Sequence, residues 1–266
     1  DEYSKDYGFS PAVVTGKPVD LFGSLGREEA TGRGVMYALE EYLKESGRKL
    51  ADVSVAVQGF GNVGSNAARL IAEQGGRIVA VSDISGGIAN NKGIDVTALL
   101  EWVGEHGVVE GFPGADAIAG DEIITWQADV LIPAALENAI TMDNVEDIRA
   151  EVIVEAANGP TTPDAHDRLQ ERGIVAIPDI LANAGGVTVS YFEWSQNIQQ
   201  FRWELERVNR ELELVMRRAY GSVAALSRDS GLDLRTAAFV LAIKRVARAA
   251  VSRHNVGHLI PRNLLD

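Results

Sequence analysis

The stretch Val53-Ser-Val-Ala-Val-Gln-Gly-Phe-Gly-Asn-Val-Gly64 decides the fold of this 266-residue chain. Four apolar residues fall within positions 53–58, which predicts a buried strand. The pattern G-x-G-x-x-G follows at Gly59, Gly61 and Gly64. In such a turn the first glycine lets the chain leave the strand sharply, the second leaves room for a pyrophosphate, and the third lets the next helix pack closely. The stretch therefore predicts a strand, a phosphate-binding turn and a helix.

The residues that follow complete a βαβ unit. Val63, Ala67, Leu70 and Ile71 recur at helical spacing, so one helix face is buried and the helix N-terminus points free amides at an anion. A second strand over 77–82 ends at Asp83, 24 positions after Gly59 and close to the roughly 20 expected for the acid that binds a ribose diol. These features favour a dinucleotide site over the alternative, an ordinary glycine-rich turn with a solvated Asp83.

Strands and helices alternate through most of the chain. We expect further strands at 129–135, 152–157 and 173–178, turns at 86–93, and helices at 29–45, 96–105, 141–149 and 163–172. Such alternation predicts an α/β fold with a doubly wound, Rossmann-type, mostly parallel sheet and helices on both faces. Helices alone are expected later, at 187–200, 203–227 and 234–254. We therefore divide the chain into an N-terminal segment (1–26), a dinucleotide-binding domain (27–186) and a C-terminal helical segment (187–266).

The expected helix at 29–45 begins unusually. Its first turn contains Thr31-Gly-Arg-Gly34, and glycine is a poor helix former. This concentration of glycine predicts that another backbone or a ligand comes close to the helix.

Composition narrows the classes of function. The formal net charge of −13 argues against sequence-independent nucleic-acid binding, which needs a basic face. The absence of cysteine excludes disulfides, thiolate zinc sites and a cysteine nucleophile. The four histidines show no metal-binding pattern, so no metal is expected. With no apolar run near the roughly 18 residues of a membrane span and no visible signal peptide, we expect a cytoplasmic protein without membrane or nucleic-acid partners.

Five spaced motifs occur in a fixed order. They are Gly26-Arg-Glu-Glu-Ala-Thr-Gly-Arg-Gly34, Gln58-Gly-Phe-Gly-Asn-Val-Gly64, Ile132-Pro-Ala-Ala135, Ala157-Asn-Gly-Pro-Thr-Thr162 and Asn183-Ala-Gly-Gly186. Together they resemble the glutamate/leucine/phenylalanine/valine dehydrogenase family, over about residues 10–251. The resemblance implies the NAD(P)-binding domain of a glutamate dehydrogenase. Such an enzyme oxidatively deaminates L-glutamate to 2-oxoglutarate and ammonia by hydride transfer to nicotinamide.

The resemblance also implies roles for the matching residues. Asn62 and Val63 would meet the pyrophosphate, Asp83 the adenosine ribose, and Thr31 the carboxamide of the nicotinamide. The full cofactor-binding set is Thr31, Gln58, Gly59, Phe60, Gly61, Asn62, Val63, Gly64, Asp83, Ile84, Ala134, Ala135, Asn158 and Asn183. Within it, Ala134 and Ala135 would line the adenine side, and Asn158 and Asn183 the nicotinamide half.

Three residues are implied on the substrate side, namely Arg27, Val187 and Ser190. Ser190 would help to hold the distal carboxylate of glutamate, a role that an apolar side chain cannot fill. The alternative is a serine that bonds to its own helix backbone.

The expected cofactor is NAD, with NADP as the alternative. Asp83 would repel a 2′-phosphate, and Ile84 offers it no hydrogen-bond donor. The family's catalytic lysine, in a G-G-x-K-G-G-type motif, and its catalytic aspartate belong to a preceding substrate domain. No such motif occurs in this sequence, so we assign no catalytic residue to the chain and expect it to be inactive alone.

The resemblance further implies a homo-oligomer at full length, a hexamer. Two other functions stay open. One is the corresponding domain of a leucine-, phenylalanine- or valine-type dehydrogenase, and the other is a non-catalytic NAD-sensing module.

Overall fold

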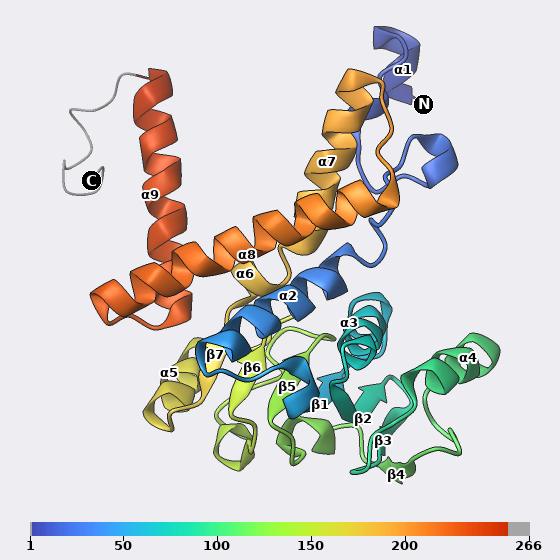
Figure 1. The fold of residues 1–266 in the computed structure, drawn as a ribbon, viewed down its shortest axis with the longest axis vertical. Helices are drawn as coiled ribbons and strands as arrows, with labels where there is room; N and C mark the ends of the chain where they lie inside the picture. The colour runs from blue at the N-terminus through green and yellow to red at the C-terminus, as the bar shows by residue number, and fades with distance from the viewer. Residues whose placement is uncertain (1, 255–266) are drawn as a thin grey trace.

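A single seven-stranded sheet organises the chain in a computed structural model, which describes residues 2–254 (Figure 1). Its parallel strands are β1 (Ser54–Gln58), β2 (Arg77–Asp83), β5 (Val130–Pro133), β6 (Val152–Val154) and β7 (Val175–Ile177). Two antiparallel strands, β3 (Gly86–Ala89) and β4 (Asp116–Ile118), form one edge, and the order is β4-β3-β2-β1-β5-β6-β7. Because the chain moves outward from β1 in both directions, the sheet is doubly wound. The expected fold class is confirmed.

Helical segments cover both faces of the sheet. Val55 and Val57 of β1 belong to a buried cluster that includes α2 (Ala30–Glu45), α3 (Asn62–Glu73), α4 (Val96–His106) and α8 (Leu205–Ser230). Ala56, between them, belongs to a second cluster with α5 (Pro163–Glu171) and the short 3-10 turns at 122–125 and 145–147. Burial on both faces explains why the central strands are apolar at successive positions.

Helix α2 packs against both α3 and α7 (Gly185–Gln199) at short backbone distances. A Cβ atom on Gly32 would lie 2.6 Å from the backbone nitrogen of Ala67 in α3. Two residues later, a Cβ atom on Gly34 would lie 3.0 Å from the Cα of Gly185 in α7. Any larger side chain would force these helices apart, so the close approach predicted from the glycine-rich start of α2 is confirmed.

Ion pairs at Glu29 fasten the start of α2 to α3. The Glu29 carboxylate lies 2.5 Å from Arg33 Nη2 and 2.6 Å from Arg69 Nη2. Burial alone would raise the pKa of Glu29, but the two guanidinium groups outweigh it and hold that pKa below its ordinary value.

The later helices extend beyond the sheet. Helix α8 buries a stripe of residues at helical spacing, namely Val208, Leu212, Met216, Tyr220, Val223 and Ala224. Its Arg217 pairs with Glu40 of α2 at 2.6 Å. Helices α7 and α9 (Leu234–His254) both project away from the sheet, whereas α6 (Asp179–Ala182) follows β7 directly (Figure 1).

The N-terminal segment contains α1 (Glu2–Tyr7) and lies along α7 (Figure 1). Its anchor is Glu193, whose fully buried carboxylate accepts hydrogen bonds from Gly16 N at 2.9 Å and Lys17 Nζ at 2.5 Å. Asn197 adds a bond from its Nδ2 to the Phe22 carbonyl at 2.9 Å. Residues 16–22 are therefore tied to α7 although they form no regular strand.

Two local predictions are wrong, and one strand was missed. Part of the expected turn at 86–93 is strand β3, because β2 supplies its hydrogen-bond partners. Strand β4 was not predicted at all. The expected helix at 141–149 is a 3-10 turn over 145–147, because Asn144 bonds to the Thr141 amide and the Ala139 carbonyl and so competes with helix formation.

Residues 255–266 of the expected C-terminal segment lie outside the described part of the chain. Within residues 2–254, no helix has the length and apolar character needed to cross a membrane.

Candidate nucleotide and substrate site

Two cavities adjoin at the carboxyl ends of the parallel strands, where ligands bind in open α/β sheets. One, of about 580 Å³, is lined by Gln58, Gly59, Phe60, Gly61, Asp83 and Ile84. The other, of about 880 Å³, is lined by Arg27, Thr31, Val63, Asn158, Asn183, Val187 and Ser190. Ala134, Ala135 and Leu136 line both. Of the residues expected at the site, only Asn62 and Gly64 line neither cavity.

The turn after β1 explains why these two residues do not line the cavities. A Cβ atom on Gly64 would lie 1.8 Å from the Gly59 carbonyl oxygen, so only glycine lets α3 start this close to the strand. The Asn62 side chain donates to the Glu28 carbonyl at 3.0 Å and thereby ties α3 to the segment before α2. Space is open around Gly61, where an added Cβ would meet nothing within 4 Å.

The N-terminus of α3 faces this open space and has the chemistry of an anion site. The first amides of a helix have no partner within it, and the helix dipole favours negative charge there. The turn can therefore accept a phosphate group through backbone donors alone.

Asp83 lies in the smaller cavity, but its carboxylate already has partners. Its Oδ1 accepts hydrogen bonds from Ser85 N at 2.8 Å and Ser85 Oγ at 2.5 Å, and its Oδ2 accepts one from Val109 N at 2.8 Å. A carboxylate has about four acceptor positions, so these bonds leave about one for a ligand unless the Ser85 hydroxyl turns away. The adjacent Ile84 side chain is fully exposed and offers no polar group.

In the larger cavity, Arg27 and Ser190 are joined. Arg27 Nε donates to Ser190 Oγ at 2.9 Å, which links the segment before α2 to α7 across 163 residues. The Ser190 hydroxyl therefore has a side-chain partner, unlike the alternative of a serine bonded to its own helix. Val187 is 69% exposed one turn earlier on α7 and presents an aliphatic surface to the same cavity.

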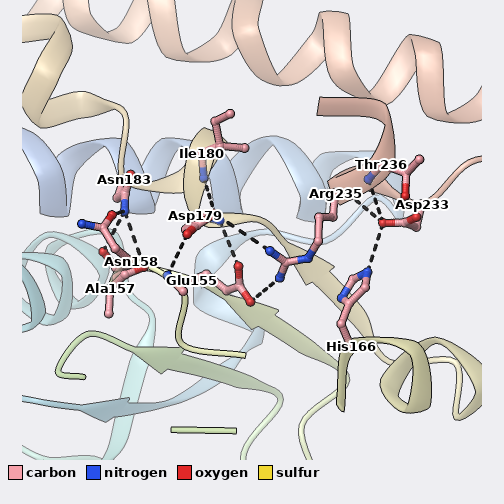
Figure 2. Close-up of polar contacts among 12 residues, drawn as sticks. Glu155, Ala157, Asn158, His166, Asp179, Ile180, Asn183, Asp233, Arg235 and Thr236 are labelled. Atoms are coloured by element: carbon pink, nitrogen blue, oxygen red, sulfur yellow. Dashed lines mark hydrogen bonds and ion pairs between the residues drawn. The ribbon is translucent and has the colours of Figure 1, made fainter. Parts of the chain in front are cut away.

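Asn158 and Asn183 also meet directly. Asn183 Nδ2 donates to Asn158 Oδ1 at 2.8 Å (Figure 2). It also donates to the Ala156 carbonyl at 3.3 Å. This arrangement leaves the Asn158 Nδ2 donors and the Asn183 Oδ1 acceptor for a ligand, a set that complements a carboxamide.

Several residues at or behind the site were not predicted. Ser85 and Val109 hold Asp83, and Glu155, Asp179 and Arg235 lie behind Asn158. Glu155 carried a signal that could have been used, because it is a charged residue at the end of a buried strand. Among the described residues, no group of three or more histidines and carboxylates is arranged to hold a metal.

Comparison with known proteins identifies the family. A family model described as glutamate/leucine/phenylalanine/valine dehydrogenase matches residues 23–253. The chain belongs to this family. It is 50% identical over 255 residues to the glutamate dehydrogenase of Thermotoga maritima, a match that covers 95% of this chain and 61% of that protein. The chain thus spans about three fifths of the length of that family member.

Solved family structures agree with the fold. The hetero-hexameric glutamate dehydrogenase of Thermus thermophilus, in its leucine-bound form, superposes with a TM-score of 0.88 at 36% identity, over 94% of this chain and 60% of that one. The glutamate dehydrogenase of Peptoniphilus asaccharolyticus gives a TM-score of 0.82 at 38% identity, over 96% of this chain and 61% of that one.

Proposed function

We propose that this chain is the NAD(P)-binding part of a glutamate dehydrogenase, which deaminates L-glutamate oxidatively to 2-oxoglutarate and ammonia. The observation that carries the proposal is the pair of adjoining cavities along the strand ends, with the turn after β1 beside them. One cavity has the residues for a nucleotide, and the other has the residues for a carboxamide and an acidic substrate. A bound nicotinamide would supply the hydride acceptor.

The residues present fit a dinucleotide. The open space at Gly61 and the N-terminus of α3 suit a pyrophosphate, and Asp83 suits a ribose diol. Ala134 and Ala135 would form the shared wall, while Thr31, Asn158 and Asn183 would orient the nicotinamide end. We propose NAD as the preferred cofactor, with NADP as the alternative, because Asp83 and Ile84 give a 2′-phosphate repulsion and no donor.

For the substrate, the joined Arg27 and Ser190 favour glutamate. The guanidinium carries a positive charge into the cavity, and the hydroxyl proton remains free to be donated to a carboxylate. An enzyme for leucine, phenylalanine or valine would need an apolar surface at this point. The aliphatic Val187 would contact the carbon chain in either case.

Proton transfer is assigned to a substrate domain outside this sequence. In this view residues 27–186 bind the dinucleotide, and the segments 1–26 and 187–266 connect to that domain. At full length we propose a homo-oligomer, a hexamer; the relative from Thermus thermophilus is also a hexamer, although a hetero-hexamer. A cytoplasmic location stays a prediction.

Calorimetric titration of the chain with NADH and NADPH separately, at low and at molar salt, tests the nucleotide assignment. We expect saturable NADH binding that is tighter than NADPH binding. If neither cofactor binds in any salt, the nucleotide assignment fails.

A turnover assay tests where the chemistry lies. We expect no glutamate-dependent reduction of NAD by the chain alone and reduction by the full-length protein. Turnover by a pure sample of the chain would refute the assignment of proton transfer to another domain. A full-length protein that binds NAD without turning over any amino acid would instead favour the sensing module.

A further inference from the structure

A line of polar contacts connects the start of α9 to the Asn158 loop (Figure 2). Arg235, the second residue of α9, donates from Nη2 to Glu155 Oε1 at 2.5 Å. The other oxygen of Glu155, Oε2, accepts a hydrogen bond from Asp179 N at 3.0 Å. The carboxylate of Glu155 thus joins three segments: the end of β6, the start of α6 and the start of α9.

Asp179 carries the connection to the cavity. Its Oδ2 accepts a hydrogen bond from Gly159 N at 2.8 Å, and its Oδ1 lies 3.9 Å from Arg235 Nη1. Gly159 follows Asn158, whose side chain bonds to Asn183 at 2.8 Å. The pair of amides that faces the larger cavity therefore rests on Asp179.

The burial of Glu155 makes Arg235 necessary to this arrangement. Glu155 is fully buried, and a buried carboxylate without a cation is strongly unfavourable. Without the guanidinium, the carboxylate would have to turn toward water, and this change disturbs its bond to Asp179 N. A buried ion pair contributes little net stability compared with apolar packing, so its consequence here is geometric.

The orientation of Arg235 is itself fixed. Asp233 Oδ1 accepts hydrogen bonds from Arg235 N at 2.9 Å and Thr236 N at 3.1 Å, which caps α9. The same oxygen lies 3.2 Å from His166 Nε2 on α5. Burial alone would raise the pKa of Asp233, but the bonds from Thr236 and the neighbouring His166 outweigh it, and the pKa lies below its ordinary value.

We propose that Arg235 is a positioning residue for the nicotinamide half of the cofactor, acting through Glu155 and Asp179 on Asn158 and Asn183. This inference rests on the proposed function, because it assumes that the larger cavity receives the nicotinamide. It assigns to the C-terminal helix α9 an effect on cofactor binding although α9 lines neither cavity.

Two ligands separate this role from a general effect on folding. NADH contains the nicotinamide, whereas ADP-ribose contains only the adenosine, pyrophosphate and second ribose. Calorimetry on the 266-residue chain should give tighter binding of NADH than of ADP-ribose. Arg235→Met should weaken NADH binding about tenfold, equivalent to ~1.4 kcal/mol, and change ADP-ribose binding less than about twofold. Arg235→Lys, which keeps the cation, should recover part of the loss.

The matched control is Arg168→Met. Arg168 pairs with Glu146 at 2.6 Å and Glu171 at 2.7 Å on the outer surface of α5, so both ligands should bind this variant normally. A second variant, Asp179→Ala, removes the acceptor of Gly159 N while leaving Glu155 paired with Arg235. It should show the same selective loss of NADH binding even if Arg235→Met does not fold.

The outcomes are distinguishable. Failure of the unaltered chain to bind either ligand would refute the proposed function itself. Equal binding of NADH and ADP-ribose by the unaltered chain, or equal weakening of both ligands in the folded variants, would refute the positioning role alone.

Discussion

Replacing Asp83 with asparagine should reverse much of the preference between NADH and NADPH. Asparagine has nearly the same shape but no charge, so a ribose diol loses a charge-assisted hydrogen bond and keeps a neutral one. Charged hydrogen bonds contribute ~1.5–3 kcal/mol and neutral ones ~0.5–1.5 kcal/mol, so NADH should bind roughly fivefold more weakly.

NADPH should gain from the same substitution. Two unit charges ~5 Å apart repel by ~3 kcal/mol at an effective dielectric constant of ~20, and partial exposure to water and salt reduces this to ~1–2 kcal/mol. Removing the repulsion should therefore tighten NADPH binding roughly 5- to 30-fold. The ratio of the two affinities should shift by about 25-fold or more at low salt, and by less at molar salt.

The ratio is the quantity to measure, by calorimetric titration of both cofactors. Asparagine cannot accept all three bonds that Ser85 and Val109 donate to Asp83, so the loop loses stability, but this loss affects both cofactors and cancels in the ratio. Asp95→Asn is the control, because Asp95 caps α4 through the Ala98 amide and asparagine caps equally well. A ratio that stays within about twofold in Asp83→Asn would refute the assignment of the ribose to Asp83.

Three further perturbations test other features. In the full-length protein, Ser190→Leu should lower kcat/KM for glutamate roughly 10- to 100-fold, because a hydrogen bond to a carboxylate is lost. Leucine turnover should not be reduced. An equal loss of kcat/KM for both substrates would argue against a role of Ser190 in specificity. Tyr220→Phe should leave the free energy of unfolding in urea unchanged or raise it by up to ~1 kcal/mol. The buried hydroxyl has no hydrogen-bond partner among the described residues, and its burial raises the pKa of Tyr220. A clear loss of stability would instead show that the hydroxyl has a partner. Burial would raise the pKa of Asp129, but two hydrogen bonds from Ser54 help to hold that pKa below its ordinary value. The stability that Asp129 contributes is therefore present above its unfolded pKa of about 3.9 and is lost as the pH falls through its folded pKa. The stability difference between the wild type and Asp129→Ala should therefore shrink in urea unfolding as the pH falls below about 4, and a constant difference would contradict the linkage.

The parts of the fold that were predictable are those specified by neighbouring residues. The strand before Gly59, the helix after Gly61 and the strand that ends at Asp83 each have their signal within a short stretch of sequence. Strand β3 could not be predicted in this way, because its two leading glycines disfavour a strand and only the partner β2 makes it one. The helix expected at 141–149 failed for the opposite reason, since side-chain bonds of Asn144 outweigh the helical pattern.

In the candidate site, too, local features could be predicted and contacts between distant residues could not. Many of its lining residues lie in motifs at strand ends, which a parallel sheet brings to one edge. The others, Arg27, Thr31, Val187 and Ser190, were named from the resemblance to the family. Two of the supporting contacts were not found because they join distant positions: Asp83 to Val109, and Glu155 to Arg235 across 80 residues. Neither spacing nor periodicity in one sequence carries information about such pairs. The roles of the individual residues in binding stay predictions until the titrations are made.

The tight packing of α2 limits how parts could be exchanged between members of this family. Helix α3 begins at the glycine-rich turn after β1, α7 carries Val187 and Ser190, and both touch α2 where its glycines leave no room for a side chain. If α7 alone were replaced by that of a relative with a different amino-acid preference, the new helix would fit poorly against Gly34. Any shift of α2 that relieved this poor fit would also displace the turn after β1. We expect chimeras to fold when α2 and α7 are exchanged together. If Ser190 determines the substrate, as we propose, substrate preference would then be transferred by this helix pair and not by α7 alone.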